Sequence, residues 1–250
     1  MSDGVKIGIV TAMETEVWPL VRTWRRVRRK CSSRTYRFFE SENAVVLAGG
    51  IGHAAGTKAA EAVVTSYAPE LLVATGLAGA LRREFAPPKT MMPARVIDEE
   101  TGREFTTAHG EGTVVSSRTI AGAAKKAELA LRFPAADIVD MEGAAVAEVA
   151  AKHGIPFLAV KAVSDELEFD LPPLDHYVDA AGRFETVRFT LAAAVHPQWW
   201  RMIAALKRKT DAAAKELAEV LKQVIREQAG QPNPAFSTTS SHEPARSGAQ

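Results

Sequence analysis

The sequence has a single cysteine, no long apolar run and almost no net charge. One cysteine, Cys31, excludes an internal disulfide and a cysteine-rich metal site, and it fits a reducing compartment. No segment reaches the roughly 18 apolar residues that a membrane-spanning helix needs. The first residues lack the apolar stretch of a signal peptide, so we expect a cytoplasmic protein. Lysine plus arginine number 31 against 30 acidic residues, which argues against a protein devoted to nucleic acid.

Basic residues are nevertheless concentrated in one segment. Between Arg22 and Arg37 there are eight of them and no acidic residue. One interpretation of this 22–37 run is the solvated end of a helix, since a helix C-terminus favours cations. The other is peripheral contact with anionic lipid, where each charge near the surface contributes about 1 kcal/mol. Nucleic acid is less favoured, because no motif with interleaved aromatic residues accompanies the charges.

Short apolar strands alternate with helices along most of the chain. Strands are predicted at 5–10, 43–50, 71–76, 113–116, 138–141 and 156–163. Helices are predicted at 13–29, 52–67, 121–131 and 142–153, with one or two more in 196–228. Strands that are apolar throughout and alternate with helices predict an α/β domain covered on both faces.

Three segments depart from this alternation. Residues 82–112 contain several prolines and are interpreted as irregular. The domain is predicted over 1–229, with 167–229 as an extended C-terminal segment. Residues 230–250 are rich in Pro, Ser, Thr and Gly, have almost no apolar content and are predicted to be a disordered tail.

Acidic residues and glycine-rich turns follow the predicted strands, where ligands bind in open α/β sheets. Glu16, Glu142 and Asp165 each come shortly after a strand. Several carboxylates at one site indicate acid–base chemistry or hydroxyl binding. Each also has an ordinary explanation: Glu16 as a first-turn acid and Asp165 as an N-cap. Glu142 opens a helix directly after an apolar strand, so it faces either the helix dipole or a ligand.

Five segments taken together resemble the methylthioadenosine/S-adenosylhomocysteine nucleosidases of the nucleoside phosphorylase superfamily. They are, in order, 5–17, 50–52, 75–79, 140–142 and 163–165. The resemblance covers roughly residues 5–166. It implies a single α/β domain with a mixed, mostly parallel central sheet flanked by helices. It also implies hydrolysis of the N-glycosidic bond of a purine nucleoside with release of adenine, no metal or organic cofactor, and a homodimer.

The resemblance assigns roles by position. Asp165 matches the acid that protonates purine N7, and such help contributes about 10²–10⁴-fold to the rate. Glu16 matches the residue that activates the attacking water. The positions that match substrate-binding residues are Glu142, Met141, Ser164, Gly76 and Ala78. Among these, Glu142 would bind the ribose 2′- and 3′-hydroxyls. His109, His153, His176 and His196 show no metal-ligand spacing.

Departures from the methylthioadenosine enzymes point to a different substrate. Leu77 stands where those enzymes usually have serine, and Lys161 where arginine is usual. The turn at 76–79 and the segment 102–105 are more similar to nucleosidases associated with hopanoid biosynthesis. That similarity implies an adenosine joined through C5′ to a large apolar triterpene, which Trp199 and Trp200 would cover.

Three alternatives stay open. The first is phosphorolysis, although the carboxylates after the first strand repel phosphate and favour hydrolysis. The second is methylthioadenosine or S-adenosylhomocysteine as the substrate. The third is a nucleoside-binding protein without activity, against which the presence of all three acids argues. His53 follows a glycine turn, and we favour a capping or surface role over a place in the site.

Overall fold

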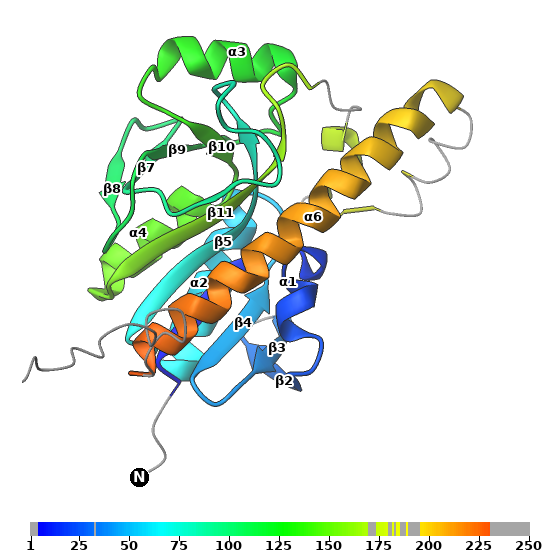
Figure 1. Cartoon of the computed structure of the whole chain (residues 1–250). Coiled ribbons are helices and arrows are strands. Elements are labelled where there is room, and N and C mark those ends of the chain that lie inside the picture. Colours follow the sequence, from blue (N-terminus) through cyan, green and yellow to red (C-terminus); the bar gives the residue numbers. More distant parts are fainter. Residues whose placement is uncertain are drawn as a thin grey trace, which may run out of the picture.

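A mixed sheet forms the centre of the molecule in this computed structural model (Figure 1). The structure describes residues 5–32, 34–169, 174–179, 182, 184–185, 189 and 196–230. Eleven strands of this part of the chain belong to the sheet. They are β1 (Ile7–Thr11), β2 (Arg25–Cys31), β3 (Arg34–Glu40), β4 (Ala44–Ala48), β5 (Leu71–Ala80), β6 (Thr90–Met91), β7 (Arg95–Asp98), β8 (Glu104–Thr106), β9 (Thr113–Ser116), β10 (Ile138–Asp140) and β11 (Phe157–Asp165).

The strand order is β2-β3-β4-β1-β5-β10-β9-β7-β8, and β11 pairs with β5 and β6. The long strand β5 is the hub, because β1 and β11 run parallel to it and β10 pairs antiparallel with its end. Parallel pairs also join β1 to β4 and β9 to both β10 and β7. The antiparallel pairs β2–β3 and β7–β8 lie at the two edges. The predicted α/β fold with a mixed central sheet is confirmed.

Helices cover both faces of the sheet (Figure 1). They are α1 (Glu14–Val21), α2 (His53–Tyr67), α3 (Ala123–Arg132), α4 (Gly143–His153) and α6 (Pro197–Gln228), with a short 3₁₀ helix at Leu174–Tyr177. The pair α2 and α4 packs on one face and the pair α1 and α6 on the other, and each pair encloses an apolar core. Burial on both faces explains why β1 and β11 are apolar along most of their length. None of the helices in the described ranges is both long and apolar enough to cross a bilayer.

The helix predicted over 13–29 is wrong in its second half. Helix α1 ends at Val21, and Arg25–Cys31 is the edge strand β2, paired antiparallel with β3. An edge strand exposed to water carries charged residues in place of apolar ones, so its sequence lacks the signal of a buried strand. The interpretation of the 22–37 run as the end of a helix is therefore wrong as well.

The interpretation of 82–112 as irregular is also wrong. This segment contributes β6, β7 and β8, and β7 pairs with β9 inside the sheet. These strands have two to four residues each, too few for a periodic pattern to be visible. The region 196–228 forms one long helix, α6. The tail predicted over 230–250 lies, beyond its first residue, outside the described residues.

Candidate active site

A cavity of about 430 Å³ lies at the carboxyl ends of β1, β5, β10 and β11. Six of the seven predicted site residues line it: Glu16, Ala78, Met141, Glu142, Ser164 and Asp165. The seventh, Gly76, lies behind Glu16 and does not line the cavity. The structure thus brings together side chains that are up to 149 positions apart in the sequence, since 165 minus 16 is 149. Because β1 and β11 run parallel to β5, Glu16 and Asp165 reach one edge of the sheet, and the antiparallel pairing of β10 with the end of β5 brings Glu142 to them.

Glu16 sits in the first turn of α1 and is buried. The Thr11 hydroxyl donates a hydrogen bond to its Oε2, and the Met13 backbone N–H donates another at 3.0 Å. Burial raises the pKa of Glu16 above its ordinary value, although both hydrogen bonds oppose this shift. A carboxylate with a raised pKa takes up a proton more readily, which suits a general base.

The backbone at Gly76 explains why a glycine is needed there. Its φ of +141° is a conformation that other residues rarely adopt. A Cβ at this position would lie 3.2 Å from Glu16 Oε2. The glycine therefore makes room for the Glu16 carboxylate, although it takes no direct part in the cavity wall.

Glu142 is the N-cap residue of α4 and points across to the start of α2. Its Oε1 accepts a hydrogen bond of 2.6 Å from the Gly52 N–H. Burial, together with the nearby charge of Asp140, raises the pKa of Glu142 to about 8. Lys161 acts in the opposite direction. A pKa of about 8 means that Glu142 holds a proton through much of the neutral range, so it can donate one hydrogen bond as well as accept others.

Asp165 ends β11 at an irregularity in the pairing with β5. The register shifts between Val163 and Asp165, and a bulge of this kind re-aims side chains at a sheet end. The Ser164 hydroxyl donates a 2.5 Å hydrogen bond to Asp165 Oδ1, so Ser164 holds this carboxylate. The other oxygen of Asp165 contacts the amine of Lys126 from α3.

Two buried lysines at this site were not among the predicted site residues. Lys161, on β11, lies 2.6 Å from Asp140 Oδ2 and has no solvent exposure. Burial alone would lower the pKa of Lys161, but Asp140, Glu142 and Glu16 together raise it. The positive charge of Lys161 therefore offsets part of the negative charge of these three carboxyl groups. The sequence offered a signal for Lys161, which stands at an arginine position of the family, but none for Lys126.

Part of the remaining wall is apolar and comprises Ile51, Leu77, Phe184, Phe189, Ile203 and Leu206. Polar side chains also line the cavity, namely Thr15, Thr119, Lys207, Thr210 and Asp211. Trp199 and Trp200, expected to cover an apolar substrate, do not line the cavity. Trp199 instead stacks on His196, and Trp200 is 57% exposed. The apolar surface thus comes from the next turns of α6 and from two phenylalanines that precede it.

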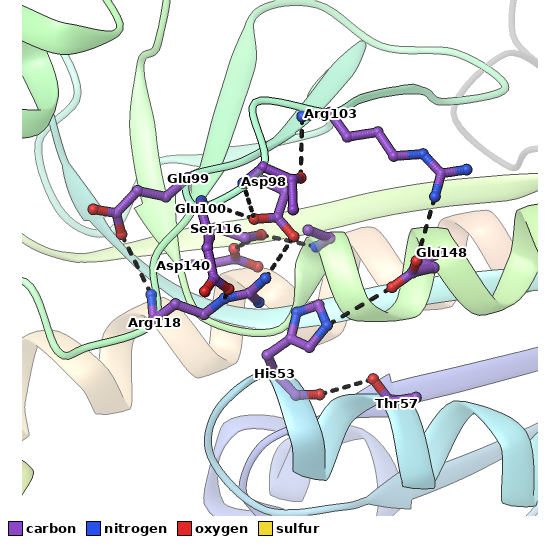
Figure 2. Close-up of polar contacts among 12 residues, drawn as sticks. His53, Thr57, Asp98, Glu99, Glu100, Arg103, Ser116, Arg118, Asp140 and Glu148 are labelled. Carbon is purple, nitrogen blue, oxygen red and sulfur yellow. Dashed lines mark hydrogen bonds and ion pairs between the residues drawn. The ribbon is translucent and has the colours of Figure 1, made fainter.

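A second polar cluster supports the site from outside. Figure 2 shows His53, the first residue of α2, between Arg118 and Glu148. Its Nε2 lies 3.8 Å from the Glu148 carboxylate, and burial lowers the pKa of His53. His53 does not line the cavity, as expected for a capping or surface residue.

In the same cluster, the Ser116 hydroxyl donates a 2.5 Å hydrogen bond to Asp140, the partner of Lys161 (Figure 2). This hydrogen bond therefore fixes the position of Asp140 and, with it, the buried ion pair between Asp140 and Lys161. Within the described residues, no cluster of three or more histidine, cysteine, aspartate or glutamate side chains is arranged to hold a metal ion.

Comparison with known proteins places the chain in a family. Among curated proteins, the 5′-methylthioadenosine/S-adenosylhomocysteine nucleosidases of Shewanella halifaxensis and Shewanella loihica are each 26% identical to it, and each match covers 71% of this chain and 94% of the relative. Among solved structures, futalosine hydrolase of Helicobacter pylori strain 26695 superposes with a TM-score of 0.65 at 17% identity, over 89% of this chain and 97% of the other. The adenine complex of the 5′-methylthioadenosine/S-adenosylhomocysteine nucleosidase from Colwellia psychrerythraea 34H gives 0.66 at 17% identity, over 90% and 96%.

These solved structures show the fold, and the sequence profile of the family shows the membership. The family described as Phosphorylase superfamily matches this chain over residues 6–113 and 104–226. The chain belongs to the phosphorylase superfamily.

Proposed function

We propose that this protein hydrolyses the N-glycosidic bond of an adenosine-type nucleoside and releases adenine. The observation that carries the proposal is the convergence of Glu16, Glu142 and Asp165 on one cavity. Its volume of about 430 Å³ lies within the range of about 300–1,000 Å³ typical of small-molecule sites. The names of the curated relatives, all methylthioadenosine/S-adenosylhomocysteine nucleosidases, support the same reaction.

In the proposed reaction, Asp165 acts as the acid and Glu16 as the base. Asp165 gives a proton to purine N7, and the electron pair of the C1′–N9 bond moves onto the purine as that bond breaks. A water molecule attacks C1′ of the resulting cationic sugar and gives its proton to Glu16. The raised pKa of Glu16 favours this proton transfer. Glu142 binds the ribose hydroxyls, because its carboxyl group can accept hydrogen bonds from them and, when protonated, donate one.

The charges of the cavity favour water over phosphate as the attacking group. Glu16 and Glu142 both face the cavity, and in their ionised forms they repel a phosphate dianion strongly where water is scarce. Lys161 interacts electrostatically with both carboxyl groups, but its amine is paired with Asp140. Lys207 lines the cavity and is paired with Asp211, so phosphate would meet no unpaired lysine among the described cavity-lining residues.

The test is adenine release from 5′-methylthioadenosine by the purified protein in a buffer without phosphate. Release under these conditions supports hydrolysis, and Asp165→Asn should abolish most of it. Release that requires added phosphate would show a phosphorylase instead. Tight adenine binding without any release would show a nucleoside-binding protein.

For the substrate, we propose an adenosine with a large apolar group at C5′, such as the triterpenyl group implied by the similarity to hopanoid-associated nucleosidases. The apolar wall formed by Phe184, Phe189, Ile203 and Leu206 supports this choice. The test compares initial rates with methylthioadenosine, S-adenosylhomocysteine, futalosine and a C5′-triterpenyl adenosine. A clear preference for S-adenosylhomocysteine, whose 5′ group carries charges, would contradict the apolar assignment.

We further propose that this protein is cytoplasmic and touches anionic membrane through the 22–37 run. Arg26, Arg28 and Lys30 alternate along the edge strand β2, so their side chains share one face. None of the three has an ion-pair partner among the residues that the structure describes. The Arg26 guanidinium lies 5.3 Å from the ring centre of Trp18, which is 44% exposed. Exposed tryptophan beside cations suits the surface of a bilayer.

Sedimentation with phosphatidylserine vesicles tests the membrane contact. The wild type should bind these vesicles, and a variant with Arg26→Glu and Arg28→Glu should not. Equal binding to neutral phosphatidylcholine vesicles would contradict an electrostatic contact. The homodimer implied by the family resemblance is proposed as well, and a monomer in sedimentation velocity would refute it.

A further inference from the structure

A buried lysine contacts the proposed acid from behind the cavity wall. Lys126 lies on α3, a helix in which only Lys126 and Leu129 are buried. Its side chain has no solvent exposure. The amine contacts Asp165 Oδ2 and donates a hydrogen bond of 2.6 Å to the Glu166 carbonyl oxygen. The Lys126 amine therefore binds the end of β11, which carries the acid.

Such a burial needs a reason, because removing an ammonium group from water carries a desolvation penalty that its ion pair and hydrogen bonds must offset. An apolar side chain such as methionine would fill the same space without this cost. The adjacent residue offers a direct comparison. Lys125 is 27% exposed and pairs with Glu99 and Glu128 at the surface, so α3 has one ordinary lysine and one buried one.

The last residues of β5 are also shaped around this contact. A Cβ at Gly79 would lie 2.8 Å from Lys126 Cε and 3.2 Å from Asp165 Oδ2. Any larger residue at this position would push the lysine away from the carboxylate. The turn expected at 76–79 from the sequence is instead part of β5, and Gly79 of this strand and Lys126 on α3 fit each other although they are distant in the sequence.

Both oxygens of Asp165 are held in this arrangement. Ser164 donates to Oδ1 and Lys126 donates to Oδ2. Lys126 itself does not line the cavity, so it acts on a substrate only through Asp165. A carboxyl group fixed at both oxygens is kept in one orientation, which acid catalysis requires.

We propose that Lys126 is a positioning residue that fixes the orientation of Asp165, an inference that rests on the proposed nucleosidase function. The Lys126 amine and the Ser164 hydroxyl each hold one oxygen of Asp165, so the carboxyl group meets purine N7 in a single orientation.

The test uses Lys126→Met, Lys126→Ala and the control Lys125→Met, with adenine release as the assay. Lys126→Met should lower kcat by about 100-fold, while KM changes by less than about threefold, because the lysine does not touch the substrate. Lys125→Met should keep wild-type kinetics. Lys126→Ala leaves space for a small amine, so propylamine should restore kcat at least about tenfold, and propanol should not.

Three results would overturn the inference while the wild type still releases adenine. They are a Lys126→Met variant with wild-type kcat, a loss confined to KM, and a folded Lys126→Ala variant that propylamine does not rescue. If Lys126→Met fails to fold, rescue of Lys126→Ala decides alone. Failure of the wild type to release adenine from any of the four nucleosides refutes the proposed function itself, so the two failures are distinguishable.

Discussion

The buried carboxyl group of Glu142 makes stability depend on pH in a predictable direction. Its pKa rises from an ordinary 4.5 to about 8 on folding, chiefly because of burial. Between these two values the folded protein binds one more proton than the unfolded chain. Stability is therefore fully present below pH 4.5 and is lost as the pH rises to about 8. Each pH unit in this interval costs about 1.4 kcal/mol, so the whole interval costs about 5 kcal/mol.

The substitution Glu142→Gln removes the ionisation and keeps the shape. The glutamine oxygen can still accept the Gly52 N–H, so the contact with the start of α2 is preserved. We expect the free energy of unfolding of this variant to exceed that of the wild type by an amount that grows by up to about 5 kcal/mol between about pH 5 and about pH 9. The same variant should bind nucleosides more weakly, since stability and activity compete at such sites.

Urea unfolding of both proteins at several pH values measures this difference. Glu148→Gln is the matched control, because Glu148 lies on the same helix and is 49% exposed. Its effect should stay within about 1 kcal/mol at every pH. Stability curves that run parallel for wild type and Glu142→Gln would refute the reasoning.

Four further predictions concern the cavity. Asp165→Asn should lower kcat by at least about 100-fold while adenine binding by calorimetry persists, and a fully active variant would reject the acid. Burial raises the pKa of Glu16, and only the ionised form of this side chain accepts a proton from water. We therefore expect kcat/KM to rise with pH through this pKa and Glu16→Gln to be slow at every pH tested. Gly76→Ala should destabilise the protein by about 1–3 kcal/mol in urea unfolding, because its φ is +141°; an unchanged midpoint would contradict this strain. Ile203→Ala should raise KM about tenfold for an apolar 5′ substituent and leave adenosine unaffected, whereas equal effects on both would place Ile203 elsewhere.

Much of the fold could be predicted from the sequence because buried strands are visible in it. β1, β4 and β11 are apolar along nearly their whole length, since helices cover both of their faces. The hairpin β2–β3 was missed because its outer strand faces water and is almost entirely basic. The segment with β6, β7 and β8 was missed because these strands depend on distant partners more than on local pattern.

Some residues of the candidate site could likewise be predicted from the sequence, and others could not. Glu16 and Asp165 belong to parallel strands whose carboxyl ends meet at one edge, so their common location could be predicted. Lys126 could not, because its contact with Asp165 joins a helix and a strand end that are 39 residues apart. No periodicity distinguishes Lys126 from its exposed neighbour Lys125. The α6 residues that line the cavity were predicted a few positions too early in the helix. Every apolar position of a helix follows the same spacing, so the sequence alone does not show which neighbour each side chain contacts.

The cavity draws its reactive groups and its apolar wall from different kinds of element. The carboxyl groups sit on or just after the central strands β1, β10 and β11. Ile203 and Leu206 are neighbours on one turn of α6, a helix that crosses the outside of the sheet (Figure 1). Substitutions at two or three positions of α6 would thus change which nucleosides are accepted, without altering the carboxyl groups that cleave the bond.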